Sequence, residues 1–426
     1  MIALVREKEN ILILQDALKI LWSGGAVIPM RDESLTILAG GWKEGTPCGG
    51  RAVFSELVLS FLEDLRKEIL TAPETKNWPE AVSFAFWCRR GRLLKWKEEI
   101  TEWQQRKGRG ILFHVAPSNI PALFAYSMVY GMLSGNGTLI RISEKIRETA
   151  QPLLTVIERI LKRDAYRNLY QETLIFTYAH DTEWNAYFSG ICNGRILWGG
   201  DATILAFRSA AVQPGCIQME FPDRYSVALL EEDYIDHLSE KDLQELAERF
   251  YNDTYEADQN ACSSPKVIFW IRGEQNNEAR NKWWEMVHQV CRGRYLLDTM
   301  RANEKYAQLC RTAMDVEEIE QIIQKDNYLY RIVLHSCNGD LTKYQGNYGT
   351  FYEYGLEKKE DLCEYLTRKI QTIIYAGNTE LKEIRQMIRN GNTLGGDRVV
   401  SPGEALLLAE NWDGNDMIRI LSRVIG

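Results

Sequence analysis

The chain of 426 residues lacks several patterns that define common enzyme classes. It contains no GxxxxGK[ST] phosphate-binding loop and no GxSxG pattern, which argues against a nucleotide kinase and a serine hydrolase. GxGxxG is missing too, which would count against a standard dinucleotide-binding domain. His288 and Cys291 lie three residues apart on an expected helix, but two further ligands at zinc spacing are missing. We therefore expect no bound metal.

Long apolar runs, CxxC pairs and clusters of basic residues are also missing. The most apolar stretch, residues 111–135, is interrupted by two prolines, a histidine and an asparagine, so we expect no membrane span. The nine cysteines are irregularly spaced and odd in number, which is typical of free thiols in a reducing cytosol and favours a cytoplasmic protein. The net charge is −8, so we expect no nucleic-acid partner.

The length and the alternation of patterns indicate an α/β fold with more than one domain. Hydrophobic residues make up 45% and charged residues 26% of the chain, as in ordinary globular proteins. Residues 1–104 look mostly helical, residues 105–235 alternate strands and helices in a Rossmann-like manner, residues 236–395 form a second α/β unit, and residues 396–426 form a tail. We expect a flexible joint at residues 391–396 and a helix capped by Ser239 that ends near Tyr255.

Residues 111–143 carry the pattern of a βαβ unit. A buried strand at 111–116 is followed by a turn between Pro117 and Pro121, both of which bias the preceding residue away from helix. An apolar helix at 122–133 and a second strand at 138–143 complete the unit. Its crossover implies a parallel sheet. A generic α/β unit with a stiff turn is the plainer interpretation.

Cys262 stands on a short polar loop between a helix that ends and a strand at 266–271. A thiol at the mouth of a strand can face solvent and accept hydrogen bonds, whereas a structural cysteine more often lies within an apolar run. The plainer interpretation is that Cys262 is a small buried residue, because free cysteine is among the most buried residue types.

Together these segments resemble the aldehyde dehydrogenase superfamily and, within it, the acyl-CoA reductases of the LuxC type, the reductase family of bacterial luminescence systems. The resemblance rests on seven segments that occur in the family's order: 113–121, 134–141, 197–204, 261–266, 370–372, 397–404 and 412–414. It runs from about residue 105 to the C-terminus, and the first hundred residues match only loosely. It implies that residues 105–235 bind a dinucleotide and that residues 236–395 carry the nucleophile.

The resemblance implies a catalytic role for Cys262 and Asn119. The Cys262 thiolate would take the acyl group from a thioester, an exchange that is close to neutral in energy because the product is also a thioester. The Asn119 side chain and the Cys262 backbone N–H would hold the oxyanion, at roughly 3–4 kcal/mol each. Asn119 could instead be an Asx-turn residue between prolines.

The expected reaction is then the NAD(P)H-dependent reduction of an acyl thioester, such as a fatty acyl-CoA, to the aldehyde. Reduction of an acyl phosphate, acyl transfer or thioester hydrolysis, and a non-catalytic subunit remain alternatives. The resemblance also implies an acyl-activating protein as a partner and a homo-oligomer.

Cofactor residues also follow from the resemblance. Gly199 and Gly200 lie between a strand and a helix start, where small residues let a pyrophosphate approach backbone N–H groups. Arg141, at the end of the second strand, would face the adenine ribose and could pair with a 2′-phosphate, which favours NADPH. Ser143 and Glu144 follow in the same register. Glu144 could instead hold a ribose 2′-hydroxyl, which would favour NADH, and Arg141 could be an exposed strand end.

Glu220 lies where hydrolytic aldehyde dehydrogenases carry a general-base glutamate followed by two glycines. The residues that follow here are Phe221, Pro222 and Asp223, so the motif is broken. A reductase that passes its acyl group to hydride does not need to activate water, and we therefore expect Glu220 to be non-catalytic.

Overall fold

The computed structural model describes residues 35–179, 182–273, 278–337, 339–407 and 411–426. The chain divides into two compact units. Unit 1 comprises Met1–Pro222 and Asp416–Gly426, and unit 2 comprises Asp223–Asn415. The expected α/β class is confirmed, because both units are built on largely parallel sheets.

Unit 1 contains a six-stranded sheet with the order β1-β5-β4-β3-β6-β7. Every neighbouring pair is parallel except β1 with β5. The chain proceeds from β3 outward through β4 and β5, then returns to the other side of β3 for β6 and β7, which is the doubly wound arrangement. The strands are β1 (Leu35–Gly40), β3 (Ile111–Val115), β4 (Gly137–Arg141), β5 (Thr173–Tyr178), β6 (Gly194–Trp198) and β7 (Ile217–Phe221).

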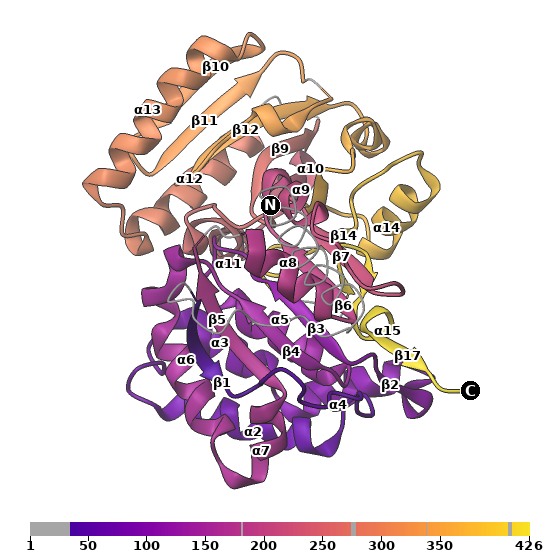
Figure 1. Ribbon diagram of the computed structural model, residues 1–426. Helices are drawn as coiled ribbons and strands as arrows, with labels where there is room; N and C mark the ends of the chain where they lie inside the picture. Colours follow the sequence, from indigo (N-terminus) through magenta and orange to yellow (C-terminus); the bar gives the residue numbers. More distant parts are fainter. Residues whose placement is uncertain (1–34, 180–181, 274–277, 338, 408–410) are drawn as a thin grey trace, which may run out of the picture. The chain divides into compact units, whose positions relative to one another are not determined.

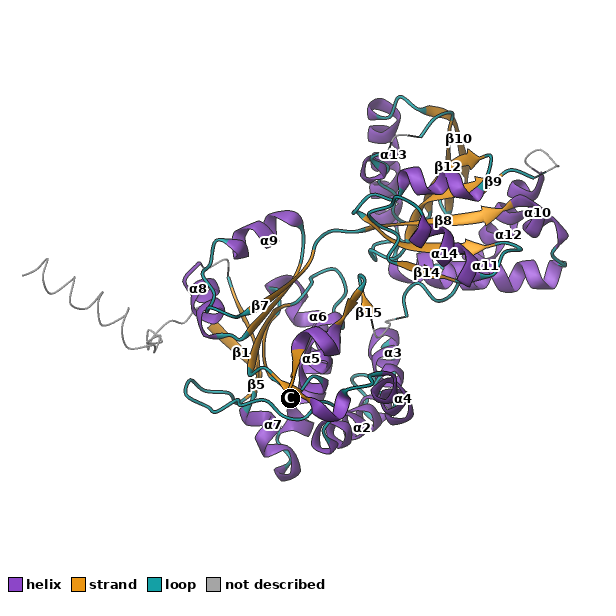
Figure 2. Ribbon diagram, turned by 90° about the vertical axis from the view of Figure 1, so that its right-hand side faces the viewer, coloured by secondary structure: helices purple, strands orange, loops and turns teal. Residues whose placement is uncertain are grey.

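Helices cover both faces of this sheet (Figure 2). On one face lie α5 (Leu123–Leu133) and α6 (Arg147–Leu161); on the other lie α8 (Thr182–Ile191) and α9 (Asp201–Arg208). Helix α5 is buried along almost its whole length, as its all-round apolar sequence predicts. The helix ends at Leu133, and Gly135, with a positive φ of 85°, makes the left-handed turn that follows it.

The described part of the N-terminal section, residues 35–104, is mostly helical as expected, apart from strand β1, and residues 1–34 lie outside the described residues. Helices α2 (Glu56–Thr71), α3 (Pro79–Trp87) and α4 (Arg90–Glu99) belong to unit 1. The Trp87 ring makes edge contacts with Tyr126 and Tyr130 of α5, at centroid distances of 5.1 and 5.4 Å. The section is therefore packed onto the sheet's own helix layer.

The C-terminal residues return to unit 1. Strand β17 (Ser422–Val424) pairs antiparallel with β2 (Arg106–Gly108), and the Asn136 side chain donates to the Leu421 carbonyl at 2.9 Å. Much of the segment expected to be a simple tail is thus part of the unit that begins the chain.

Unit 2 contains a seven-stranded sheet with the order β10-β11-β12-β9-β8-β13-β14, parallel except for β10 with β11. Residues 223–235, expected as the end of the dinucleotide-binding domain, belong instead to unit 2, and their strand lies near the middle of this second sheet. The strands are β8 (Tyr225–Glu231), β9 (Pro265–Ile271), β10 (Ile319–Lys325), β11 (Leu329–Leu334), β12 (Thr350–Leu356), β13 (Ile370–Ala376) and β14 (Arg398–Val400).

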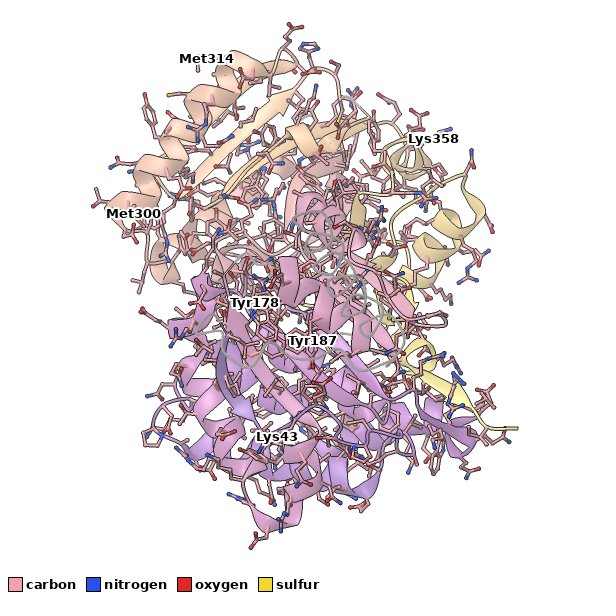
Figure 3. All side chains as sticks on the ribbon, viewed as in Figure 1. Lys43, Tyr178, Tyr187, Met300, Met314 and Lys358 are labelled. Carbon is pink, nitrogen blue, oxygen red and sulfur yellow. The ribbon has the colours of Figure 1, made fainter. Side chains whose placement is uncertain are left out.

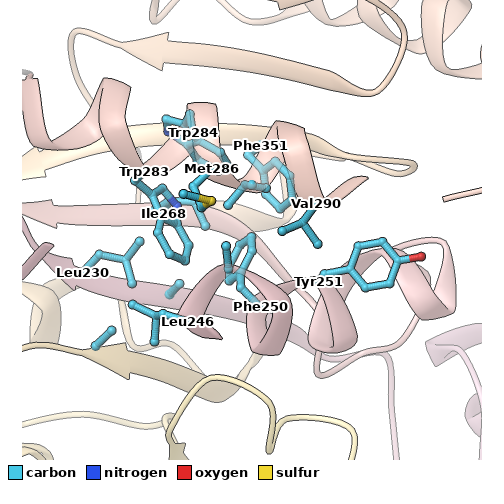
Figure 4. Close-up of a cluster of buried hydrophobic side chains, with 14 of the residues drawn as sticks. Leu230, Leu246, Phe250, Tyr251, Ile268, Trp283, Trp284, Met286, Val290 and Phe351 are labelled. Carbon is cyan, nitrogen blue, oxygen red and sulfur yellow. The ribbon is translucent and has the colours of Figure 1, made fainter. Parts of the chain in front are cut away.

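Helices α11 (Glu240–Thr254) and α12 (Glu278–Arg294) pack together on one face of this sheet. Figure 4 shows the resulting core, in which Phe250, Trp283 and Trp284 meet Ile268 and Phe351 from the sheet. The expected cap of α11 is confirmed, since the Asp242 N–H donates to Ser239 Oγ at 3.2 Å.

The opposite face is covered by α13 (Thr299–Asp315) and α14 (Leu381–Asn390), whose Leu309, Ile384 and Ile388 join the second core cluster. Helix α13 runs beside β10 and β11 (Figure 1). Met300 and Met314, labelled in Figure 3, are exposed on this helix. Within the described ranges, no helix combines the length and apolarity needed to cross a membrane.

The glycine-rich segment at 391–396 is hydrogen-bonded to the chain beside it. Gly395 N–H donates to Leu366 O at 3.0 Å and Gly396 N–H to Ile370 O at 2.9 Å. A β-carbon at Gly395 would collide with the Thr367 carbonyl oxygen. Glycine is therefore required for close packing. The structure has a packed, hydrogen-bonded segment here in place of the expected flexible joint.

Candidate active site

Several of the predicted site residues of unit 1 lie at one edge of its sheet. Asn119 follows β3, Arg141 ends β4, and Gly199 and Gly200 follow β6. These three strands are parallel neighbours, so their carboxyl ends share an edge. The strand order reverses direction between β3 and β6, and ligands of doubly wound sheets bind outside the carboxyl ends at such a switch point.

The loop after β3 presents the Asn119 side chain to solvent. Its base is fixed by the Ala116 N–H, which donates to Arg141 O at 2.9 Å. Its far end is held by the Ala122 N–H, which donates to Glu80 Oε2 at 3.4 Å. Asn119 is exposed and hydrogen-bonds to none of the described residues, so its amide is available to a ligand. An Asx turn does not occupy it.

His114, on strand β3, has a structural role. Its Nδ1 lies 2.8 Å from Ser127 Oγ, which also accepts from Trp198 Nε1 at 3.1 Å. Burial lowers the pKa of His114 to about 3. The ring is therefore neutral and is part of the core, as the sequence suggests.

Arg141 is held over an aromatic ring. Its guanidinium carbon lies 4.9 Å from the centroid of Tyr178, which Figure 3 labels. Such stacking fixes the plane of the guanidinium. The Nε atom of Arg141 is buried and has no hydrogen-bond partner among the described residues. Arg141 is thus a positioned cation with an unused donor, rather than an exposed strand end.

Ser143 and Glu144 have local partners. Ser143 Oγ accepts from the Lys145 N–H at 3.3 Å and caps the short helix η2 (Glu144–Ile146). Glu144 is exposed and forms an ion pair with Arg147 at 3.7 Å. Both side chains lie near Arg141 in sequence, but each already has a structural role.

Gly199 and Gly200 lead into helix α9. Gly200 is the N-cap residue, with extended backbone angles. A β-carbon at Gly199 would lie 3.2 Å from the Thr203 side chain, so a larger residue would require that side chain to shift. The positive end of the α9 dipole therefore lies at the same sheet edge as Asn119 and Arg141.

Glu220 on β7 forms a two-point ion pair with Arg208 at the end of α9. Arg208 Nε donates to Oε1 at 2.8 Å, and the second guanidinium nitrogen contacts Oε2. The Arg208 hydrogen bonds lower the pKa of Glu220. A carboxylate held in this way is a poor general base, which agrees with the expectation that Glu220 is not catalytic.

In unit 2, the loop that carries Cys262 is shaped by two residues in left-handed conformation. Asp258 and Gln259 have φ angles of 52° and 59°. The buried Gln259 side chain accepts from the Gly349 and Thr350 N–H groups at 3.1 and 3.2 Å and donates to Pro265 O at 2.9 Å. These bonds hold the strained turn in place. No motif in the sequence indicates this role for Gln259.

Cys262 lies beside the start of β8. It is a free, partly exposed thiol. The Ser226 hydroxyl donates to Cys262 O at 2.7 Å and accepts from the Thr372 N–H at 3.2 Å. The backbone N–H of Cys262 donates to no other described residue. The site therefore offers one thiol with an unpaired N–H next to it, which is the combination an oxyanion requires.

Several groups set the acidity of Cys262. Burial raises the pKa of its thiol, and the nearby carboxylates of Asp223 and Asp413 raise it further. The backbone N–H of Arg224, which hydrogen-bonds to the thiol, and the ammonium of Lys266 lower it. The Arg224 N–H and the Lys266 ammonium therefore lie near the sulfur atom that would carry the negative charge of the thiolate.

Lys266 ties the cysteine loop to a second loop. Its Nζ donates to Gln259 O at 3.2 Å, Gly346 O at 2.9 Å and Asn347 Oδ1 at 3.0 Å. Burial lowers the pKa of Lys266 to about 8, and the neighbouring Cys262 opposes that change. Lys266 belongs to the 261–266 segment, but no role for it was predicted.

The later family-like segments meet the base of the same loop. The Arg224 side chain forms an ion pair with Asp397, lies 3.9 Å from Asp413, and donates to Ile370 O at 3.0 Å. Gln371 hydrogen-bonds to Asp413. Segments 370–372, 397–404 and 412–414 are thus connected through Arg224, whose backbone N–H contacts the thiol.

Asp253 anchors the 397–404 segment to the helix before the cysteine. The Gly403 and Ala405 N–H groups donate to its carboxylate at 2.6 and 2.8 Å, and Ser264 Oγ donates to its carbonyl at 2.7 Å. Burial raises the pKa of Asp253 to about 7. In the sequence Asp253 is only a polar residue at the end of an amphipathic helix, and that position does not predict its hydrogen bonds to Gly403 and Ala405.

The structure thus gathers the predicted residues into two groups, one in each unit. Asn119, Arg141, Ser143, Glu144, Gly199 and Gly200 belong to unit 1, and Cys262 belongs to unit 2. The pairing of Asn119 with Cys262 remains a prediction. Within the described part of the chain, no cluster of three potential metal ligands is present.

The fold is that of the aldehyde dehydrogenases. Methylmalonate-semialdehyde dehydrogenase from Oceanimonas doudoroffii matches with a TM-score of 0.60 and 10% identity over 94% of this chain and 95% of that chain. A mutant of 1-pyrroline-5-carboxylate dehydrogenase from Thermus thermophilus matches with 0.58 and 12% over 86% and 79%. NAD-dependent aldehyde dehydrogenase from Sinorhizobium meliloti matches with 0.57 and 11% over 80% and 74%. At such identities the likeness concerns the fold alone.

The sequence places the chain more narrowly. A comparison with curated protein sequences gave no match. The family model of the acyl-CoA reductases (LuxC) matches residues 88–424. The chain belongs to this family, which confirms the resemblance and identifies it as an oxidoreductase that acts on acyl or aldehyde groups.

Proposed function

We propose that this protein reduces an acyl thioester, an acyl-CoA with a fatty acyl group, to the aldehyde with NADPH. The reaction passes through an acyl group bound to Cys262. The observation that carries the proposal is the surroundings of Cys262, a free thiol with an unpaired backbone N–H and the Lys266 ammonium close by. The acyl-CoA reductase family supplies the substrate class.

The first half of the reaction needs no cofactor. The Cys262 thiolate attacks the thioester carbonyl, and the Asn119 amide and the Cys262 N–H stabilise the negative oxygen. The carbon–sulfur bond to CoA then breaks, CoA leaves as a thiolate and takes a proton from solvent, and the acyl group stays on Cys262. Lys266 stabilises the attacking thiolate by its charge.

In the second half, a bound nicotinamide cofactor would supply the hydride that reduces the acyl carbon on Cys262. The same two N–H donors again hold the oxygen as its charge develops. The carbon–sulfur bond to Cys262 breaks, the aldehyde is released, and Cys262 returns to the thiolate. The Glu220 carboxylate, held by Arg208, does not activate water at any step.

The residues of unit 1 fit a dinucleotide. Gly199, Gly200 and the N-terminus of α9 would take the pyrophosphate. The unused buried Nε of Arg141 supports binding of a 2′-phosphate and hence NADPH. Glu144, the residue that would favour NADH, is already paired with Arg147. Ser143 would contribute through its hydroxyl only if the cap of η2 opened.

The test measures NADPH oxidation, CoA release and aldehyde formation with acyl-CoA substrates of several chain lengths. Wild type is compared with Cys262→Ala and with Cys310→Ala, which removes an exposed thiol elsewhere in unit 2. We expect Cys262→Ala to abolish all three signals and Cys310→Ala to leave them unchanged. Aldehyde formation that survives Cys262→Ala would refute the mechanism. CoA release without NADPH oxidation would favour an acyltransferase or thioesterase.

Two further variants separate the roles of the unit 1 residues. Asn119→Ala should lower the rate about 10²–10³-fold, as is usual for loss of an oxyanion donor. A rate within about threefold of wild type would exclude that role. Arg141→Ala should raise the KM for NADPH with little change for NADH, whereas an equal effect on both cofactors would point to a general structural role.

A further inference from the structure

Two cysteines outside the candidate site face each other in unit 1. Cys192 lies between α8 and β6, and Cys216 lies just before β7. Their Sγ atoms are 3.8 Å apart. Both are free thiols. The nine cysteines are irregularly spaced, and no motif in the sequence predicts this pair.

The sheet holds the two thiols at this separation. Strands β6 and β7 are parallel neighbours with Gly194 opposite Ile217, and the Ile217 N–H donates to Asn193 O at 3.2 Å. The backbone next to each cysteine is therefore fixed by the ladder. A disulfide requires about 2.05 Å between the sulfurs, so closing the gap takes a side-chain movement of about 2 Å, within the reach of rotation about the Cα–Cβ bonds.

The two thiols differ in exposure and in acidity. Cys192 is buried and Cys216 is partly exposed. The hydrogen bond from the Cys192 thiol lowers the pKa of Cys216, and the buried Arg195 guanidinium lowers it further. The same contact with Cys216, together with burial, raises the pKa of Cys192. This asymmetry is that of an accessible attacking thiolate next to a protonated second thiol.

Arg195 keeps its place independently of the two cysteines. Its guanidinium donates to Ser189 Oγ at 3.0 Å, to Phe207 O at 2.8 Å and to Ala210 O at 3.1 Å. The positive charge is thus fixed at the carboxyl end of α9, and it remains there whichever state the thiols adopt.

We propose that Cys192 and Cys216 form a reversible disulfide when the protein meets hydrogen peroxide. The Cys216 thiolate attacks one oxygen of the peroxide, the O–O bond breaks, and Cys216 becomes a sulfenic acid while hydroxide leaves. Cys192 then attacks the Cys216 sulfur, its proton and the hydroxyl group leave as water, and the S–S bond forms. The peroxide is reduced to two water molecules, and a thiol reductant reverses the change.

The cross-link would close the chain segment from 192 to 216, which contains β6 and α9. It lies before the start of both strands, at the edge opposite to Gly199 and Asn119. Oxidation is therefore expected to strengthen unit 1 without blocking the candidate dinucleotide site. Because the disulfide closes a loop of this length, the oxidised protein should melt at a temperature about 5 °C or more above that of the reduced protein.

The test treats the reduced full chain with hydrogen peroxide, alkylates the remaining thiols and digests with trypsin without reduction. Arg195 and Arg208 lie between the two cysteines, so trypsin separates them unless the disulfide holds them together. We expect a linked pair of peptides that is two hydrogen atoms lighter than their sum. Dithiothreitol should release it and restore the original melting temperature.

Single serine variants identify the order of events. In Cys192→Ser, we expect Cys216 to stop at the sulfenic acid, which dimedone captures. In Cys216→Ser, Cys192 should remain alkylatable at the same peroxide dose. Cys310→Ser serves as the control, because Cys310 is exposed on α13, and it should form the Cys192–Cys216 link like wild type.

Two results would overturn the proposal: full alkylation of both cysteines after a dose that oxidises Cys310, or linkage of either one to a different cysteine. None of these measurements involves turnover. The disulfide can therefore fail while the reductase activity is found, or be found while the activity fails.

Discussion

Replacing Lys266 by methionine should separate the two effects that this lysine exerts. The change keeps the length of the side chain and removes its charge. It also removes three hydrogen bonds, to Gln259 O, Gly346 O and Asn347 Oδ1. The variant therefore tests whether the ammonium serves chiefly to hold two loops together or also to acidify Cys262.

The effect on stability at pH 7 should be small. A pKa lowered from 10.5 to about 8 means that burial disfavours the ammonium by about 3 kcal/mol at neutral pH. Methionine removes that penalty, but it also loses three hydrogen bonds worth about 1 kcal/mol each. The two changes nearly cancel, so we expect the free energy of unfolding to change by less than about 1 kcal/mol.

The pH dependence of the free energy of unfolding should differ clearly between wild type and Lys266→Met. Between pH 8 and 10.5 the unfolded chain keeps a proton that the folded Lys266 has lost, so unfolding becomes less favourable as the pH rises. Relative to Lys266→Met, wild type should gain up to about 3 kcal/mol of stability from pH 7 to pH 11, measured by urea unfolding. A constant difference between the two proteins across this range would refute the assignment.

The reactivity of Cys262 provides the second measurement. The Lys266 charge favours the Cys262 thiolate, and Lys266 carries that charge below about pH 8. At pH 7 iodoacetamide should therefore alkylate Cys262 more slowly in the variant than in wild type. Mass spectrometry of the Cys262 peptide distinguishes this thiol from the other eight cysteines.

Lys305→Met is the matched control. Lys305 is also buried, with a pKa lowered by burial to about 7, and its Nζ donates to Tyr348 O at 2.7 Å and Gly349 O at 3.2 Å. It holds the same loop from the other side but does not act on the Cys262 thiol. This variant should change the pH dependence of stability and leave Cys262 alkylation unchanged. Equally slowed alkylation in both variants would mean that loop position, not charge, controls the thiol.

Two other substitutions test a buried ion pair of unit 2 and the role of Glu220. Glu353→Ala should lower the free energy of unfolding by about 3–5 kcal/mol in urea, because it leaves buried Arg331 without its partner at 2.7 Å and two tryptophan indoles without an acceptor; a loss below about 1 kcal/mol would contradict this. Glu220→Gln should leave the rate of NADPH oxidation within about threefold of wild type, since Arg208 already occupies the carboxylate, whereas a loss near that of a missing general base, about 10²-fold, would show that Glu220 takes part.

Local patterns predicted the parts of the fold in which neighbouring residues in sequence determine the structure. The β3–α5–β4 unit follows from an apolar strand, Pro117 and Pro121, and the glycine turn at Gly135. The start of α11 follows from Ser239 and its bond to Asp242. In each case the signal and the contact it produces lie within a few residues.

Partners far apart in the chain could not be predicted in this way. Strand β8 is buried on both faces, and such an apolar run reads the same in either parallel sheet. Only its pairing with β9 and β13 assigns it to unit 2. The return of β17 to β2 likewise joins segments at opposite ends of the sequence.

The candidate site shows the same division. Cys262 and Asn119 were predicted because each lies within a family-like segment. Arg224, Ser226 and Gln259 were not, because none belongs to such a segment and each acts on the cysteine loop only through the fold. The sequence therefore predicted the candidate reacting group but not the residues that contact its loop.

The proposed reaction makes use of a thiol whose pKa is raised rather than lowered. A thiolate from a weakly acidic thiol is more nucleophilic than one from a strongly acidic thiol, but less of it is present at neutral pH. The Arg224 N–H and the Lys266 charge counter the effect of burial on Cys262, which increases the thiolate fraction. With Glu220 held by Arg208, hydrolysis of the acyl thioester on Cys262 has no activated carboxylate on β7 to draw on, and release by hydride becomes the favoured path.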